Sequence, residues 1–208
     1  MRTRAWVPLL MIVAGTTCAG MLAAAVDKPT QQPPTMSPEE QAMMQKWQAF
    51  MTPGEPHKLL AAKAGSWSTK VTMWPAPGAP PSTSDGTSDF KMILDGRYLQ
   101  ETAQGTFQGM PFVGHGVTGF DNLKQKFVSS WFDNMSTGIM IAEGTYDPAT
   151  KTWTYSGEGP DVMAGEHKPM KSIEKTPSPD QSIVEVYNQT PDGKGWWKSM
   201  EMVYTRTK

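Results

Sequence analysis

The sequence predicts an all-β fold, an antiparallel up-and-down barrel of about ten strands that follows one or two short helices. From Ser66 onward, apolar and polar residues alternate with a period of two, as they do in half-buried strands. Turn-forming residues recur between these stretches, and the connections are too short for parallel crossovers. Because an open sheet of this size would leave two exposed edges, we expect the sheet to close on itself.

The chain of 208 residues begins with the pattern of a secretory signal peptide. The basic stretch MRTR precedes an apolar run that ends in the small-residue site Ala23-Ala24-Ala25. We expect cleavage after Ala25, which removes residues 1–25 and makes the protein periplasmic or secreted. The alternative is lipid attachment at Cys18, although Gly15-Thr16-Thr17 lacks the leucine and the small residue usual before such a cysteine.

The expected mature chain is weakly acidic and carries no thiol. Removing residues 1–25 takes away two arginines and no acids, so the formal charge changes from −1 to −3. It also removes Cys18, the single cysteine, and with it any disulfide. The absence of basic clusters argues against nucleic acid as a partner. No later apolar run approaches the roughly 20 residues that a membrane-spanning helix needs.

A proline-rich linker and a helical segment should precede the barrel. Residues 26–36 are polar and rich in proline, and we expect them to be disordered. Ser37 and Pro38 are typical of a helix start, and Met43 and Trp47 begin an apolar stripe along that helix. A second short helix is expected from Pro56 to Ala64. The expected organisation is therefore a signal peptide (1–25), a linker (26–36), a helical segment (37–64) and a barrel domain (65–208).

The strands are predicted from alternation between turn signals. Residues 75–86 contain four prolines and are expected to form a long loop, and Asp95-Gly96 is a strong hairpin turn signal. The last strand would place Trp196, Met200 and Tyr204 on one face. The predicted strands cover residues 66–73, 87–94, 98–107, 112–120, 126–134, 139–146, 151–157, 169–175, 182–189 and 195–206.

Several motifs in one order resemble a bacterial family known as domain of unknown function 1579. They cover about residues 41–208 and are MTPGEPHKLL (51–60), AGSW (64–67), MWPAPGAPP (73–81), LDGRYLQE (94–101), GFDN (119–122), SSWFDNMSTGIM (129–140), EGTYD (143–147) and MEMVYTR (200–206). Gly65-x-Trp67 also resembles the start of lipocalin and fatty-acid-binding barrels. Together with the strand count, these resemblances imply a calycin-like barrel. The family name carries no activity, so it assigns no residue a role.

Polar residues on the predicted strands indicate where a cavity would lie. Around Glu101 the alternation leaves two possibilities for the face that points inward. One face carries Leu99, Glu101 and Ala103, and the other carries Tyr98, Gln100 and Thr102. We hypothesise a cavity in which Gln100 or Glu101 converges with Trp131, Asp133 and Glu143. The candidate ligand-binding residues are Gln100, Glu101, His115, Trp131, Asp133, Met135, Glu143, Tyr187 and Met200. The rival interpretation is a filled core or a solvated rim.

The sequence contains no recognisable catalytic or metal-binding motif. His57, His115 and His167 show neither HxH nor HExxH spacing, and no G-x-S-x-G motif is present. We therefore expect no metal and no cofactor, and we assign no catalytic residue. Gly114-His115-Gly116 lies inside a predicted strand, which indicates a bend or a bulge. Thirteen methionines follow residue 25, and methionine lines irregular apolar space, either as core filler or around a ligand.

Three functions remain open. The leading hypothesis is binding of a small, mostly apolar ligand in the barrel cavity. The second is an enzyme whose cavity carboxylates carry out acid–base chemistry, which a carboxylate with a raised pKa would favour. The third is a structural or interaction module with a filled interior. The sequence predicts no oligomeric state.

Overall fold

The computed structural model describes residues 36–162 and 164–207. The predicted signal peptide, its cleavage after Ala25, the alternative at Cys18 and residues 26–35 of the linker lie outside these residues. The elements in chain order are α1 (Pro38–Met51), α2 (Glu55–Ala61), β1 (Gly65–Met73), β2 (Ser82–Ile93), β3 (Tyr98–Phe107), β4 (Met110–Asp121), β5 (Lys126–Asp133), β6 (Met140–Asp147), β7 (Thr152–Asp161), β8 (Glu166–Ser178), β9 (Gln181–Gln189) and β10 (Trp196–Arg206).

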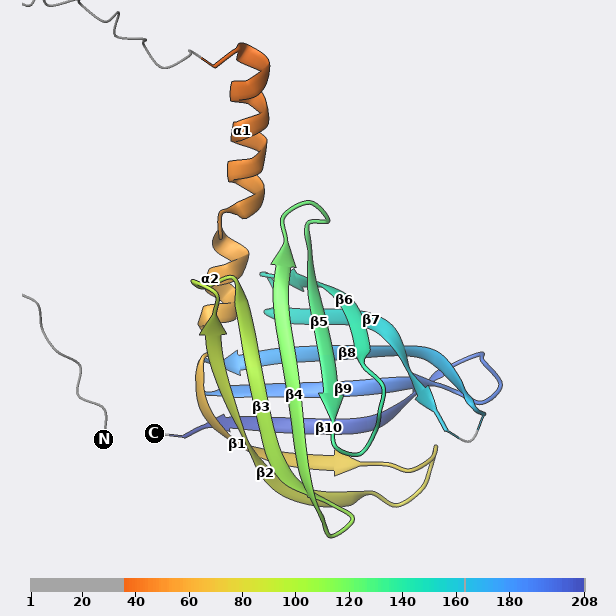
Figure 1. Cartoon of the computed structure of the whole chain (residues 1–208). Helices are drawn as coiled ribbons and strands as arrows, with labels where there is room; N and C mark the ends of the chain where they lie inside the picture. Colours follow the sequence, from red (N-terminus) through yellow and green to blue (C-terminus); the bar gives the residue numbers. More distant parts are fainter. Residues whose placement is uncertain (1–35, 163, 208) are drawn as a thin grey trace, which may run out of the picture.

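The ten strands form one closed antiparallel barrel (Figure 1). Each strand pairs with the next in sequence, and β1 closes the barrel against β10, with Trp67 opposite Arg206 and Met73 opposite Met200. The short hairpins use left-handed backbone conformations where they turn, as at Asp95 and Gly96. The prediction of an all-β up-and-down barrel behind short helices is confirmed.

Several strand boundaries differ from the prediction because pairing overrides local sequence, and β7, for example, continues to Asp161. β2 begins at Ser82, inside the predicted loop, and Ser82 pairs with Met73 across the sheet. β8 begins at Glu166, so His167 lies in a strand and not in a loop. The register of β10 also shifts between Lys198 and Met200, where a bulge interrupts the ladder.

Because of that bulge, the prediction that Trp196 shares a face with Met200 is wrong. Met200 lies on the inner face, opposite Val186 of β9. Trp196 lies on the outer face, where the Lys171 ammonium stands 4.5 Å from its ring centroid. The extra residue in β10 moves Trp197 inward in its place, opposite Asn188.

One end of the barrel is filled, and helix α2 contributes to the packing there. Leu60 of α2 is 1% exposed and packs in a cluster with Leu99, Phe127 and Trp153. The Phe127 and Trp153 rings meet edge to face with centroids 4.6 Å apart. His57 is buried on the same helix and accepts a hydrogen bond from the Gly54 amide (3.0 Å), so it serves the packing of α2.

Helix α1 projects away from the barrel (Figure 1). Ser37 and Glu40 form a capping box at its start, as the sequence predicts for a helix beginning there. None of its residues is buried, and Trp47 is 54% exposed. In the described part of the chain, no helix combines the length and the apolar character needed to cross a bilayer.

Candidate functional site

The candidate site is the half of the barrel interior that α2 does not fill. The most deeply buried inward side chains, such as Leu99, Phe127 and Trp153, lie toward α2, where Phe120 and Tyr146 are half-buried beside them, whereas the inward side chains other than glycine toward the opposite end are at most half-buried. The half-buried inward residues there include Val71, Met73, Met170, Val186, Met200 and Met202, together with the polar Ser84, Ser172 and Asn188. In a closed barrel, an inward side chain contacts solvent only through the lumen. Solvent therefore enters this half, where valine and methionine side chains form part of the walls beside serine and asparagine.

A hydrogen-bonded carboxylate lies between the filled and the open half. Glu101 faces inward on β3, opposite Phe90 of β2 and Gly116 of β4. Its Oε1 accepts hydrogen bonds from the Ser88 hydroxyl (2.8 Å) and the Tyr204 hydroxyl (3.3 Å). This arrangement decides between the two faces that the sequence allows for β3, because Leu99 and Glu101 point inward and Gln100 points outward.

Burial dominates the electrostatics of this group. Loss of solvent raises the pKa of Glu101 from its usual 4.5 to about 7, the two hydrogen bonds oppose the rise, and the charge of Glu174 adds to it. Burial also raises the pKa of Tyr204 well above its usual value. Tyr204 therefore remains a protonated donor at neutral pH, while Glu101 can exchange a proton there.

A second inward carboxylate is neutralised by an ion pair. Glu174 of β8 pairs with Lys63, which follows α2, and accepts a hydrogen bond from the Ser182 hydroxyl (2.6 Å). The Lys63 ammonium also lies 4.2 Å from the ring centroid of Trp153. Lys63 thus compensates the charge of Glu174 at the filled end and forms no ion pair with Glu101.

Trp131 and Asp133 lie at the open end on β5. The indole of Trp131 covers Gly114 and Gly116, and a Cβ on Gly114 would stand 2.3 Å from a Trp131 ring atom. The two glycines therefore make room for this ring. The prediction of a bend or bulge at Gly114-His115-Gly116 is wrong, because the pairing of β4 with β3 and with β5 stays in register there. Asp133 accepts hydrogen bonds from Trp131 Nε1 (2.9 Å) and from the Met135 amide (2.9 Å).

The structure brings only some of the predicted residues together. Glu101, Trp131, Asp133 and Met200 face the lumen, and Met135 follows Asp133 where β5 ends. Four others lie on the outer face: Gln100, His115, Glu143 and Tyr187.

The outward residues have partners outside the lumen. Glu143 pairs with Lys124 and Lys126. His115 lies 3.3 Å from the Thr102 hydroxyl on the neighbouring strand. The predicted convergence of Glu143 with Trp131 and Asp133 is therefore not formed, because alternation places Glu143 on the side of the sheet opposite to Ala142 and Gly144.

Sequence patterns did not identify Ser88, Ser182, Lys63 or Glu174 as lumen residues. In β8 the apolar Ile173 is the residue expected to face inward, yet Glu174 faces inward. The presence of Lys63 is the one sequence feature that could have pointed to Glu174 as its ion-pair partner. The two residues are far apart in the chain, however, and they meet only because of the path that the chain takes from α2 into β1.

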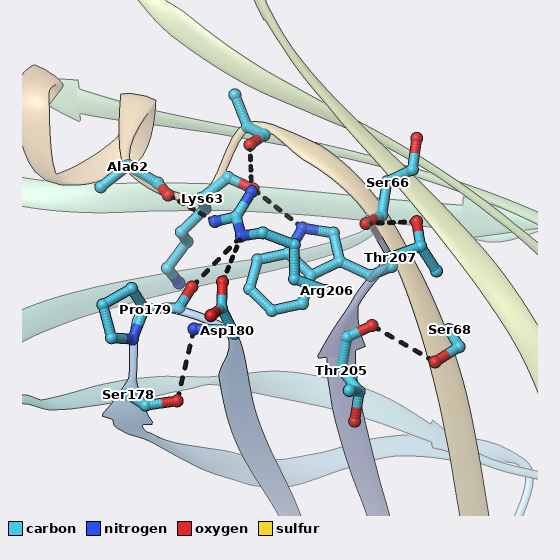
Figure 2. Close-up of polar contacts among 12 residues, drawn as sticks. Ala62, Lys63, Ser66, Ser68, Ser178, Pro179, Asp180, Thr205, Arg206 and Thr207 are labelled. Atoms are coloured by element: carbon cyan, nitrogen blue, oxygen red, sulfur yellow. Dashed lines mark hydrogen bonds and ion pairs between the residues drawn. The ribbon is translucent and has the colours of Figure 1, made fainter.

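The position of α2 is fixed by an arginine near the end of the chain. Arg206 donates hydrogen bonds to the carbonyls of Ala62 (2.9 Å) and Ala64 (2.6 Å), and its guanidinium lies 4.2 Å from the Trp67 ring centroid (Figure 2). Asp180 pairs with the same guanidinium. This explains Gly65-x-Trp67, since a Cβ on Gly65 would stand 2.6 Å from Arg206 Nη1.

Two depressions lie away from the open half. A groove of about 520 Å³ lies at the α2 end of the barrel, where Leu59 of α2 and the inward-facing Phe120, Phe127 and Tyr146 of β4 to β6 line it. A smaller one of about 330 Å³ lies over β10, β1 and β2 near Lys70 and Asp85. Among the described residues, no group of three or more His, Cys, Asp or Glu side chains is placed to hold a metal ion.

Comparison with known proteins gives a family and a fold. The family model described as "Protein of unknown function (DUF1579)" matches residues 52–206. No curated protein matches the chain. Among solved structures, Rv2717c from M. tuberculosis has a TM-score of 0.54 and 14% identity, covering 76% of this chain and 100% of that one. This likeness shows the fold alone.

Two further structures align less closely. One is a redesigned β-barrel, with a TM-score of 0.36 and 16% identity over 72% of this chain and 95% of that one. The other was solved bound to DFHBI and has a TM-score of 0.37 and 15% identity over 73% of this chain and 98% of that one.

Proposed function

We propose, since the chain belongs to the DUF1579 family of proteins of unknown function, that it binds a small, mostly apolar ligand in the open half of its barrel. The observation that carries this proposal is the partial exposure of inward valine and methionine side chains in a closed barrel. Apolar walls with a few placed polar groups are typical of small-molecule sites, and Glu101 and Tyr204 supply such groups.

The proposal can be tested with a variant that fills the lumen. Val186 faces inward on β9, so Val186→Trp should occupy the open half and abolish binding of a neutral, polarity-sensitive naphthalene dye. Ile183→Trp is the matched control, because Ile183 lies on the outer face of the same strand. If the unmodified protein binds no dye, or if both variants bind it equally, the ligand is not held in the lumen.

Native mass spectrometry of protein purified from its own source would identify the natural ligand class. A co-purifying apolar small molecule that is absent from Val186→Trp supports the proposal. A mass corresponding to the bare chain in every preparation, together with absence of dye binding, would overturn it.

We further propose that the protein is exported and cleaved after Ala25, as the amino-terminal sequence predicts. N-terminal sequencing of the protein recovered from a periplasmic or culture-medium fraction should begin at Val26. Recovery of uncleaved protein from the cytoplasm would contradict export, and a lipid-modified Cys18 would support the alternative processing.

Glu101 also favours a second function, acid–base catalysis on a bound molecule. A carboxyl with a pKa of about 7 can both donate and accept a proton at neutral pH. The two functions differ in the fate of the ligand. Recovery of the co-purified molecule unchanged after incubation indicates a carrier, whereas its conversion by the protein but not by Glu101→Gln indicates an enzyme.

A further inference from the structure

The two oxygens of the Glu101 carboxylate have different surroundings. Oε1 accepts both hydrogen bonds, from Ser88 and from Tyr204. Oε2 accepts none within the described chain, yet no buried side-chain oxygen or nitrogen there lacks a partner. Oε2 is therefore accessible from the lumen, and one acceptor of a carboxylate is left free for a ligand.

The charges around this oxygen favour a cationic ligand. The inward acids of the described residues divide into those with a lysine partner and those without one. Glu174 pairs with Lys63, and Asp161 and Glu166 share Lys168 at the β7–β8 hairpin. Glu101 and Asp133 have hydrogen bonds but no ion pair within the described chain. When Glu101 is ionised, the lumen thus carries negative charge that no ion pair among the described residues balances.

The hydrogen bonds to Glu101 show which of its two protonation states, ionised or neutral, the surrounding side chains stabilise. Ser88 and Tyr204 both donate to the carboxylate, and such bonds stabilise the ionised form. A buried carboxylate without a counter-ion is nevertheless costly. A ligand that brings a positive charge to Oε2 would remove that cost, whereas a ligand with its own carboxylate would increase it.

The walls suit the rest of such a molecule. Met73, Met200 and Met202 provide flexible, polarizable contacts along the open half. Trp131 offers an aromatic ring at the open end, and aromatic faces attract cations. An apolar body would lie among these side chains with its charged group directed at Glu101.

We propose that the lumen selects a small amphiphile that carries a protonated amine, with the ammonium bound to Glu101 Oε2 and the apolar part held by the methionine-lined walls. This inference rests on the proposed ligand-binding function and specifies the ligand class.

The test compares three probes of equal chain length, n-octylamine, n-octanol and n-octanoate, by isothermal titration calorimetry at pH 8. We expect the amine to bind at least tenfold more tightly than the alcohol and the octanoate to bind most weakly. In Glu101→Gln the amine-to-alcohol affinity ratio should fall to about one, because the amide carries no charge to attract the ammonium. Glu158→Gln, on the exposed outer face of β7, should leave the ratio unchanged.

The pH dependence provides a second measurement. Glu101 is faced by Tyr204 and Ser88, and more distantly by Glu174 and Lys63. Because the pKa of Glu101 is about 7, the amine affinity should fall about tenfold for each pH unit below 7, while the alcohol affinity should change little.

The outcomes separate the two proposals. If no probe binds and the neutral dye also fails, the ligand-binding function itself is overturned. If the alcohol binds as tightly as the amine, or the octanoate binds best, the lumen binds apolar molecules but the amine selection is wrong. If Glu101→Gln binds none of the probes and its thermal transition is no lower than that of the unmodified protein, Glu101 takes part in binding every ligand, and the charge-based selection is overturned.

Discussion

At the scale of single residues, the most informative group is Glu101. It occupies a position that a strand in a plain apolar core would give to a hydrophobic residue, between Leu99 and Ala103 on the same face. Its hydrogen bonds to Ser88 and Tyr204 only partly offset the loss of solvent, which is why its pKa rises. The chain therefore retains a carboxylate at a cost to folding stability, as expected for a functional residue.

That cost predicts how stability depends on pH. The folded-state pKa of Glu101 lies above the unfolded value of 4.5, at about 7, so folding favours the protonated form. The stabilisation that comes from protonated Glu101 is fully present below pH 4.5 and is lost as the pH rises to 7. This loss lowers the free energy of unfolding by about 3 kcal/mol.

Glu101→Gln removes the ionisation, so the variant should be more stable than the unmodified protein at pH 8, by up to about 3 kcal/mol. Urea denaturation of both proteins at pH 5 and pH 8 measures the difference. A stability difference that is the same at both pH values would show that Glu101 is not desolvated in the folded protein.

The residue scale also shows where sequence patterns are insufficient. Alternation reduces β3 to two possible inward faces, but the choice depends on Tyr204, which is more than one hundred residues away in the chain. The glycines at 114 and 116 are visible in the sequence, whereas their cause, the ring of Trp131, appears only once β4 and β5 are paired.

At the scale of elements, strands and helices were largely predictable, and their ends and faces were less so. The period of two predicted ten strands and a barrel, and the capping residues predicted where α1 starts. The bulge at the start of β10 could not be predicted, because one extra residue in a strand leaves no local mark and reverses the faces of Trp196 and Trp197. The start of β2 depended on the pairing partner that β1 provides.

Helix α1 has no buried residue, so its orientation must depend on its attachment to the barrel. The amide nitrogen of Asn122, in the β4–β5 turn, lies within hydrogen-bond distance of the carbonyls of Ala49 (3.2 Å), Phe50 (2.9 Å) and Thr52 (3.0 Å). The Arg97 guanidinium donates to the Met51 carbonyl (3.1 Å). These side chains satisfy carbonyls that the end of a helix leaves unpaired.

We expect Asn122→Ala to release the end of α1 with little effect on the barrel. Limited proteolysis should cut the segment between Met36 and Thr52 several-fold faster, while the thermal transition of the barrel should move by no more than a few degrees. Gln125→Ala is a control in the same turn, because the Gln125 side chain bonds only within that turn. Unchanged proteolysis in Asn122→Ala would show that the helix orientation does not depend on this contact.

At the scale of the whole molecule, the barrel is divided along its axis. Aromatic residues, Leu99 and Leu60 pack closely at the end covered by α2, and Arg206 ties that helix to the first and last strands. The opposite end has inward side chains that solvent contacts. Because the free energy of folding comes mainly from buried apolar surface, most of the stability should reside at the filled end. The proposed ligand site lies in the half whose packing contributes less to folding.

This division predicts unequal costs for truncating inward residues. Leu60 is 1% exposed and fully enclosed, so Leu60→Ala should lower the free energy of unfolding by about 3 kcal/mol, since it leaves a cavity that the packed surroundings cannot close. Val186 already contacts solvent in the lumen, so Val186→Ala should cost about 1 kcal/mol or less. Urea denaturation at a single pH measures both values, and tryptophan fluorescence, to which the buried Trp153 contributes, reports the transition. Equal losses in the two variants would mean that the open half is packed as tightly as the filled half. A packed lumen would have no room for a ligand, whereas a much smaller loss at Val186 means that this half contributes little to folding and is available for binding.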